Sequence, residues 1–129
     1  MPICTIQAMA LSKDKKQALV AKVTTAMKAA FLVDGEYQIF FNEYASGLIA
    51  HNGDMNATYV PIAGIECPAV STGKKATLVA EIDRALTDAY DVTDAMIFLR
   101  HYPLENVSKG GKLLVDRRAE FPAETQTHA

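Results

Sequence analysis

The second residue of the chain is a proline, and this position gives it a chemistry that an internal proline lacks. Removal of Met1 leaves Pro2 with a free secondary amine. An α-amino group ordinarily has a pKa of roughly 8, and burial among apolar side chains lowers that pKa because the uncharged form is favoured there. An amine that titrates near neutral pH can take up a proton and return it. Pro2 is therefore a candidate catalytic acid/base, although many proteins begin Met-Pro and make no catalytic use of it.

Other catalytic arrangements are missing from the sequence. It contains no glycine-rich phosphate loop, no His-x-x-x-His pair and no Gly-x-Ser-x-Gly motif. The histidines are scattered, and Cys4 and Cys67 lack the spacing of metal ligands. We therefore expect no metal and no organic cofactor. We interpret both cysteines as reduced thiols of a cytoplasmic protein.

The elements that position Pro2 come from an internal repeat. Residues 2–53 and 57–111 form two copies of one unit, and residues 112–129 form a tail. The copies share three residue pairs. Pro-Ile opens each copy at residues 2–3 and 61–62, Lys-Lys follows at 15–16 and 74–75, and Ile-Phe at 39–40 and 97–98. The nitrogen of Pro61 is an amide without basicity, so only the first copy can supply the acid/base. Self-similarity of this kind predicts two related halves of one architecture.

Each copy has the pattern strand, helix, strand. The first helix is predicted over residues 12–31, and Ser12 and Ser71 are the expected N-cap residues of the two helices. Apolar residues at helical spacing predict one buried face per helix: Leu19, Val23, Ala26, Met27, Ala30 and Phe31, then Leu78, Ile82, Ala85, Leu86, Ala89 and Tyr90. The β-branched and aromatic runs predict strands over residues 3–8, 37–44, 58–67 and 95–102.

These elements predict an α+β fold. A strand–helix–strand crossover makes its two strands parallel, and two such units side by side give a four-stranded mixed sheet with both helices on one face. Phe40, Ile97 and Leu99 indicate that neither face of the sheet is wholly polar. The face without helices therefore needs a partner, which favours an oligomer over a monomer.

Composition limits the classes of partner. The 129 residues are 50% hydrophobic, which fits a single domain over residues 1–129. The net charge is −2 without a long run of either sign, so we expect no nucleic acid and no membrane surface as partner. No stretch of about 18 apolar residues predicts a membrane-spanning helix.

Taken together, Pro2 at a strand start, the amphipathic helix over residues 12–31 and the strand over residues 37–44 resemble the tautomerase superfamily. The run over residues 36–47 matches its 4-oxalocrotonate tautomerase-like members without a gap. The doubled length is similar to the families of macrophage migration inhibitory factor, cis-3-chloroacrylate dehalogenase and malonate semialdehyde decarboxylase. The resemblance covers nearly the whole chain. It implies a β-α-β fold and a homotrimer whose active sites are shared between subunits.

The resemblance also implies where substrate binds. Glu36 falls where the decarboxylase family has an aspartate, so it can tune Pro2 or direct a water molecule, whereas Gln38 replaces a carboxylate-binding arginine. Tyr37 can line the site, and Arg117 and Arg118 in the tail can supply positive charge. Each position also has an ordinary structural interpretation. Glu36 can be a solvated carboxylate and Tyr37 a core residue, and the two arginines can make surface or subunit contacts. Arg100 and His101, in the last strand, can also face the pocket.

The predicted function is a keto–enol tautomerase, an isomerase in which Pro2 transfers a proton on a 2-oxo acid or related enol. Two alternatives stay open. One is Pro2-dependent decarboxylation, hydration or dehalogenation of a small three-carbon acid. The other is a trimeric binding module without catalysis, which the missing family arginines favour and the retained proline opposes.

Overall fold

The computed structural model describes residues 2–31, 36–55 and 59–121. The bounds of its main elements are β1 (Ile3–Met9), α1 (Lys13–Phe31), β2 (Gln38–Tyr44), β3 (Ile62–Cys67), α2 (Thr72–Tyr90) and β4 (Met96–His101). Met1, Thr58 and the end of the expected tail, residues 122–129, lie outside the described residues. The predicted strand over residues 58–67 begins at Ile62 in the structure.

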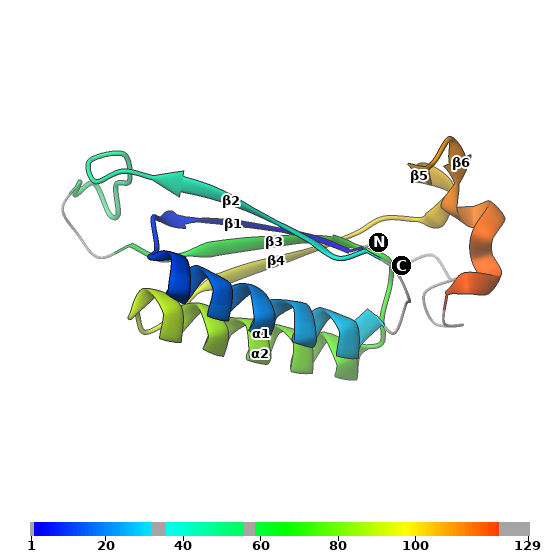
Figure 1. The fold of residues 1–129 in the computed structure, drawn as a ribbon, viewed down its shortest axis with the longest axis horizontal. Helices are drawn as coiled ribbons and strands as arrows, with labels where there is room; N and C mark the ends of the chain where they lie inside the picture. The colour runs from blue at the N-terminus through cyan, green and yellow to red at the C-terminus, as the bar shows by residue number, and fades with distance from the viewer. Residues whose placement is uncertain (1, 32–35, 56–58, 122–129) are drawn as a thin grey trace.

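The four long strands form one mixed sheet in the order β2-β1-β3-β4. β1 runs parallel to β2 and antiparallel to β3, and β3 runs parallel to β4. Both helices lie on the same side of this sheet (Figure 1). The predicted α+β architecture, two tandem β-α-β units with both helices on one face, is confirmed.

Both helices begin at the predicted serine caps. The hydroxyl oxygen of Ser12 accepts from the Lys15 amide at 3.3 Å, and that of Ser71 accepts from the Lys74 amide at 3.4 Å. Each contact satisfies a backbone N–H that has no partner within the helix. The two copies of the repeat therefore share the same serine N-cap.

The hydrophobic core lies between the helices and the sheet. All six predicted residues of α1 are buried, as are four of the six in α2. Ala89 and Tyr90 are only half-buried because they end α2, where Tyr90 packs edge to face on Tyr59. From the sheet, the fully buried Ile6 and Ile65 face this layer. The periodicity of the sequence thus predicts the packed face of each helix.

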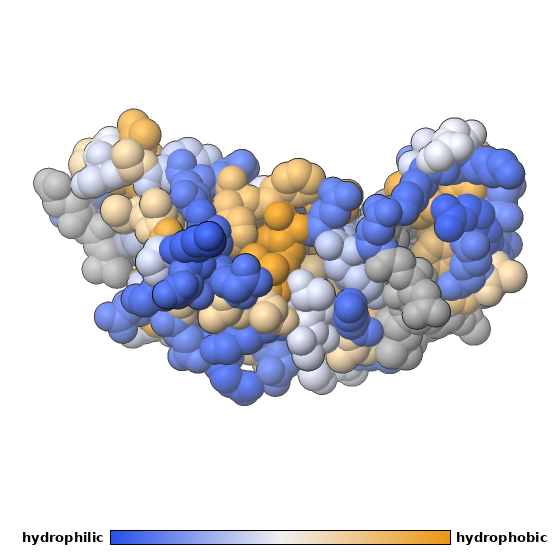
Figure 2. Space-filling model, viewed as in Figure 1, coloured by the Kyte–Doolittle hydropathy of each residue, from blue (hydrophilic) through white to orange (hydrophobic). Residues whose placement is uncertain are grey.

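The opposite face of the sheet has no helix over it, and large apolar side chains lie on it. Phe40 of β2 is 50% exposed, and Met96 and Phe98 of β4 are 49% and 43% exposed. Ile97 and Leu99 instead pack against the helix side. Figure 2, a side view of the sheet, shows strongly apolar side chains near the middle of the molecule with hydrophilic ones beside them. Exposed apolar surface of this kind marks an interaction surface.

The chain beyond β4 forms a separate small unit that projects from one end of the sheet (Figure 1). Its elements are η1 (Leu104–Asn106), β5 (Ser108–Lys109), β6 (Lys112–Leu113) and η2 (Leu114–Glu120). Gly110 and Gly111 make the turn between β5 and β6 with positive φ angles, which side chains disfavour. Leu104, Leu114 and Phe121 form its own buried cluster.

Candidate functional site

Pro2 lies directly before β1 and is fully buried. β1 is an inner strand, and its first residue, Ile3, is opposite Gln38 of β2 on one side and Glu66 of β3 on the other. One step further along these strands, Pro2 lies between Tyr37 and Cys67. The sheet therefore holds the proline from both sides, which is the pre-organisation that a proton-transferring group needs.

The same row continues across β3 to β4. Cys67 is the register partner of His101, and the Tyr102 amide donates to the Cys67 carbonyl at 2.9 Å. Burial, with the Glu66 carboxylate adding to it, raises the pKa of the Cys67 thiol to about 12. The thiol is thus protonated at neutral pH and is not a nucleophile. Cys67 packs beside Pro2 as an uncharged, apolar group.

His101 ends this row and carries an unsatisfied polar atom. Its Nε2 is buried and has no hydrogen-bond partner among the residues that the structure describes. Burial, and then the nearby ammonium of Lys75, lowers the pKa of His101, so the imidazole is neutral at pH 7. Lys75, in the first turns of α2, is a residue that reasoning from single motifs missed. The signal that could have found it is the repeat, which matches it with Lys16.

Glu36 lies just before β2 and contacts the C-terminal segment. The Nζ of Lys109 in β5 is 3.2 Å from its Oε2. Gln38, the first residue of β2, is exposed, whereas Tyr37 is half-buried and packs against the core. The structure therefore places Glu36, Tyr37 and Gln38 at the end of the sheet where Pro2 lies, and it adds Lys109 to them.

The two arginines of the tail lie in η2. Arg117 forms an ion pair with Glu120 in the same element, with 2.6 Å between Nε and Oε2. Arg118 is exposed. Of the ion pairs found among the described residues, none joins these arginines to the start of β2, so their role in binding a substrate stays a prediction.

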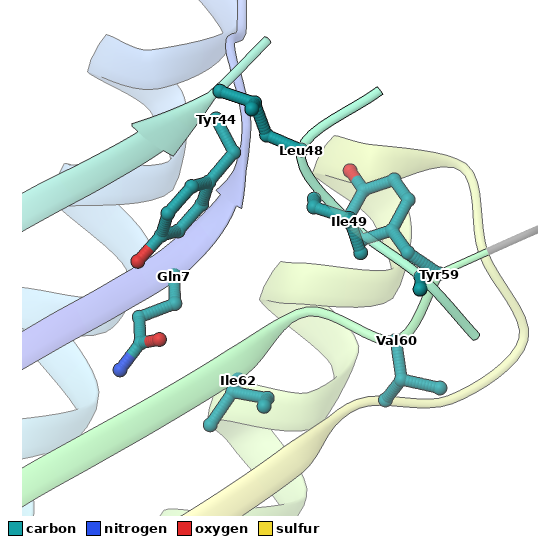
Figure 3. Close-up of a pocket in the computed structure, with 8 residues that line it drawn as sticks. Gln7, Tyr44, Leu48, Ile49, Tyr59, Val60 and Ile62 are labelled. Carbon is teal, nitrogen blue, oxygen red and sulfur yellow. The ribbon is translucent and has the colours of Figure 1, made fainter. Parts of the chain in front are cut away.

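A cavity of about 330 Å³ lies at the other end of the sheet (Figure 3). It is lined mainly by apolar side chains, with the Gln7 amide and the Tyr44 and Tyr59 hydroxyls as polar groups: Gln7, Tyr44, Leu48, Ile49, Ala50, Tyr59, Val60 and Ile62. Pro61, the counterpart of Pro2, directly precedes β3 at this end, and its carbonyl accepts from the Met96 amide at 3.0 Å. Its nitrogen is an amide, so it cannot supply the chemistry of Pro2.

Two further features concern the described residues alone. No three His, Cys, Asp or Glu side chains in this part of the chain gather as a metal site would require. Among these residues, no helix is both long enough and apolar enough to cross a bilayer.

No protein-family model and no curated protein matches the sequence. Solved structures do match the fold. A wild-type fused 4-OT described as a symmetric trimer is 15% identical with a TM-score of 0.72, covering 86% of this chain and 94% of that one. N1, of the cis-3-chloroacrylic acid dehalogenase family, is 16% identical with a TM-score of 0.71, covering 96% and 95%. Malonate semialdehyde decarboxylase, described with decarboxylase and hydratase activities, is 17% identical with a TM-score of 0.66. The match covers 85% of this chain and 92% of that one.

All three structures are of tautomerase superfamily members. The chain therefore has the tautomerase fold in its double-length form, and the resemblance seen in the sequence is confirmed at the level of the fold.

Proposed function

We propose that this chain is a tautomerase in which Pro2, freed of Met1, is the acid/base for keto–enol proton transfer on a 2-oxo acid or related enol. The observation that carries the proposal is the burial of Pro2 at the start of inner strand β1. An amine placed there is held by two neighbouring strands and is shielded from water. These are the conditions under which a proton donor and acceptor works near neutral pH.

The proposed step moves one proton. The uncharged Pro2 nitrogen removes the proton of the enol hydroxyl, and the electrons of the O–H bond become those of the carbonyl. The carbon–carbon double bond then takes up a proton at carbon from the protonated amine. The enzyme returns to its starting state, and the substrate leaves as the keto form.

We propose a homotrimer as the assembly. The support is the uncovered sheet face, with Phe40, Met96 and Phe98 about half exposed, and the trimeric assembly of the fused 4-OT that shares this fold. Burial of this face between subunits removes apolar surface from water.

Glu36 favours a second candidate, decarboxylation of a small 3-oxo acid. Its carboxylate lies next to the start of β2 and is contacted by Lys109, and one structure with this fold is malonate semialdehyde decarboxylase. In that reaction the bond between the carboxylate and its neighbouring carbon breaks, carbon dioxide leaves, and protonated Pro2 gives its proton to the carbanion left behind.

The remaining parts of the proposal concern context. Both cysteines are buried and unpaired in the structure, which supports a reduced compartment, and we place the protein in the cytoplasm. The partner is a small-molecule carboxylate or enol rather than a nucleic acid or a membrane.

The test is ketonisation of phenylenolpyruvate and 2-hydroxymuconate, followed by absorbance, with wild-type protein and a folded Pro2→Ala variant. We expect turnover by the wild type and a loss of about 10²- to 10⁴-fold in the variant, the usual contribution of acid/base catalysis. Equal turnover in both proteins contradicts the proposal. Turnover of malonate semialdehyde but of neither enol supports the decarboxylase instead.

A further inference from the structure

The two ends of the sheet carry equivalent lysines in different surroundings. The repeat matches Lys16 of α1 with Lys75 of α2, and Glu43 of β2 with His101 of β4. The strand register agrees with this match, because Glu43 is opposite Ala8 just as His101 is opposite Cys67, and Ala8 corresponds to Cys67. The same local geometry therefore holds a carboxylate at one end and an imidazole at the other.

At the end with Pro61, the lysine is neutralised. The ammonium of Lys16 forms an ion pair with Glu43 and lies over the Phe41 ring, 5.2 Å from its centre. A positive charge that is paired in this way within the chain has little left to offer a ligand. At this end, therefore, the lysine that matches Lys75 is paired with a carboxylate, and the proline has no basic nitrogen.

At the end with Pro2, the counterpart lysine lacks a carboxylate. Lys75 forms no ion pair within the part of the chain that the structure describes. The Nε2 of His101 is buried without a partner among the same residues. The nearest carboxylate along β3, Glu66, is paired with Arg100 at 3.3 Å. A cation and an unsatisfied imidazole nitrogen thus remain together, close to Pro2.

We propose that Lys75 and His101 bind the carboxylate of the substrate on which Pro2 acts. The inference rests on the proposed function and names the residues that bind the carboxylate of its substrate. The ammonium of Lys75 donates one hydrogen bond to the carboxylate, and His101, in its Nε2–H tautomer, donates a second. These two groups take the place of the carboxylate-binding arginine that Gln38 replaces.

The spacing suits a small acid. Pro2 and His101 stand two strands apart in one row, with Cys67 between them, so their backbones are separated by about 10 Å. The substrate then has its carboxylate at β4 and its reacting carbon and oxygen at Pro2.

Kinetics with a charged and an uncharged substrate test this assignment. The variants are Lys75→Gln, which removes the cation, His101→Glu, which copies the Lys16–Glu43 pair, and Lys75→Arg, which keeps the charge. Lys16→Gln is the matched control at the other end of the sheet. The substrates are phenylenolpyruvate and its methyl ester, in which the same enol lacks the negative charge.

We expect Lys75→Gln and His101→Glu to raise KM for the acid about 10- to 100-fold, as loss of a charged hydrogen bond does, with KM for the ester nearly unchanged. Lys75→Arg should retain most of the affinity, and Lys16→Gln should affect neither substrate. Equal losses on the acid and the ester, or no loss on either, overturn the inference.

A binding measurement separates this inference from the proposed function. Malonate is titrated into each protein while the carbon-bound ring protons of His101 are followed by NMR. Shifts that saturate in the wild type and vanish in Lys75→Gln support the anion site, even where no enol is turned over and the proposed function fails. A wild type whose His101 signals do not respond to malonate overturns the site, even where enols are turned over.

Discussion

The ammonium of Lys109 lies 3.2 Å from a carboxylate oxygen of Glu36, so the β5–β6 hairpin contacts the chain just before β2. The Glu36 side chain is 61% exposed, and the pair is accordingly expected to contribute at most about 1 kcal/mol to stability. Its significance is electrostatic. Glu36 is next to Tyr37, the neighbour of Pro2 in the sheet, and Lys109 partly cancels its charge there.

Glu36→Gln and Lys109→Met should therefore move the pH profile in opposite directions. Without Glu36, the protonated amine of Pro2 loses a stabilising negative charge, so the limb of the kcat/KM profile that reports this amine moves to lower pH. Without Lys109, the Glu36 charge is no longer compensated, and the limb moves to higher pH. Each shift should be about half a pH unit. Shifts of the same sign in both variants would show that Glu36 does not act on Pro2.

Extension of the chain before Pro2 should abolish activity. Any residue attached there converts the ring nitrogen to an amide, which cannot take up a proton at neutral pH. Intact mass spectrometry should show the native protein without Met1, and an N-terminal tag should reduce turnover to the level of Pro2→Ala. Proteolytic removal of the tag to leave Pro2 first should restore turnover. An active protein that still carries the tag would exclude the proline amine as the acid/base.

The stability of the protein should fall on acidification because of His101. Burial, and then Lys75, lowers the pKa of His101 from 6.5 in the folded state. Below pH 6.5 the unfolded chain binds a proton that the folded chain does not, so the free energy of unfolding decreases as the pH falls through this value. His101→Gln should lose less stability than the wild type between about pH 7.5 and about pH 5 in urea unfolding at fixed protein concentration.

His51→Gln, in the connection between β2 and β3, is the control for loss of a histidine. If wild type and His101→Gln lose the same stability over this pH range, protonation of His101 is not coupled to unfolding.

Charges placed on the uncovered sheet face should prevent assembly. Phe98→Asp and Phe40→Asp each replace an apolar side chain whose burial contributes about 1.5–3 kcal/mol with a carboxylate that is costly to bury. We expect monomers by sedimentation equilibrium, with helical circular dichroism retained and activity lost. Gln17→Asp on the exposed side of α1 should leave the trimer intact. A trimer that survives both phenylalanine substitutions would place the interface elsewhere.

The sequence by itself determined the repeat, both helices with their serine caps, the buried face of each helix and the α+β topology. These features are local or periodic: a cap acts on the next turn, and a buried stripe follows from 3.6 residues per turn. The parallel pairing within each unit then followed from its strand–helix–strand crossover, whereas the strand order β2-β1-β3-β4 came from the structure. Pro2 could be proposed from the sequence because removal of Met1 would free its amine; its role as acid/base stays a prediction.

Only the tertiary structure decided which charges lie near that proline. Lys109 with Glu36, and Lys75 with His101, come from segments far apart in the chain, and no local pattern relates them. The β5–β6 hairpin was likewise not predicted from sequence, because its two-residue strands have no periodic pattern. Such pairs depend on the path of the whole chain and on which side chains are buried. The two ends of the sheet therefore differ in a way that only the structure shows: Lys16 is paired with Glu43 at one end, and Lys75 lies near His101 at the other.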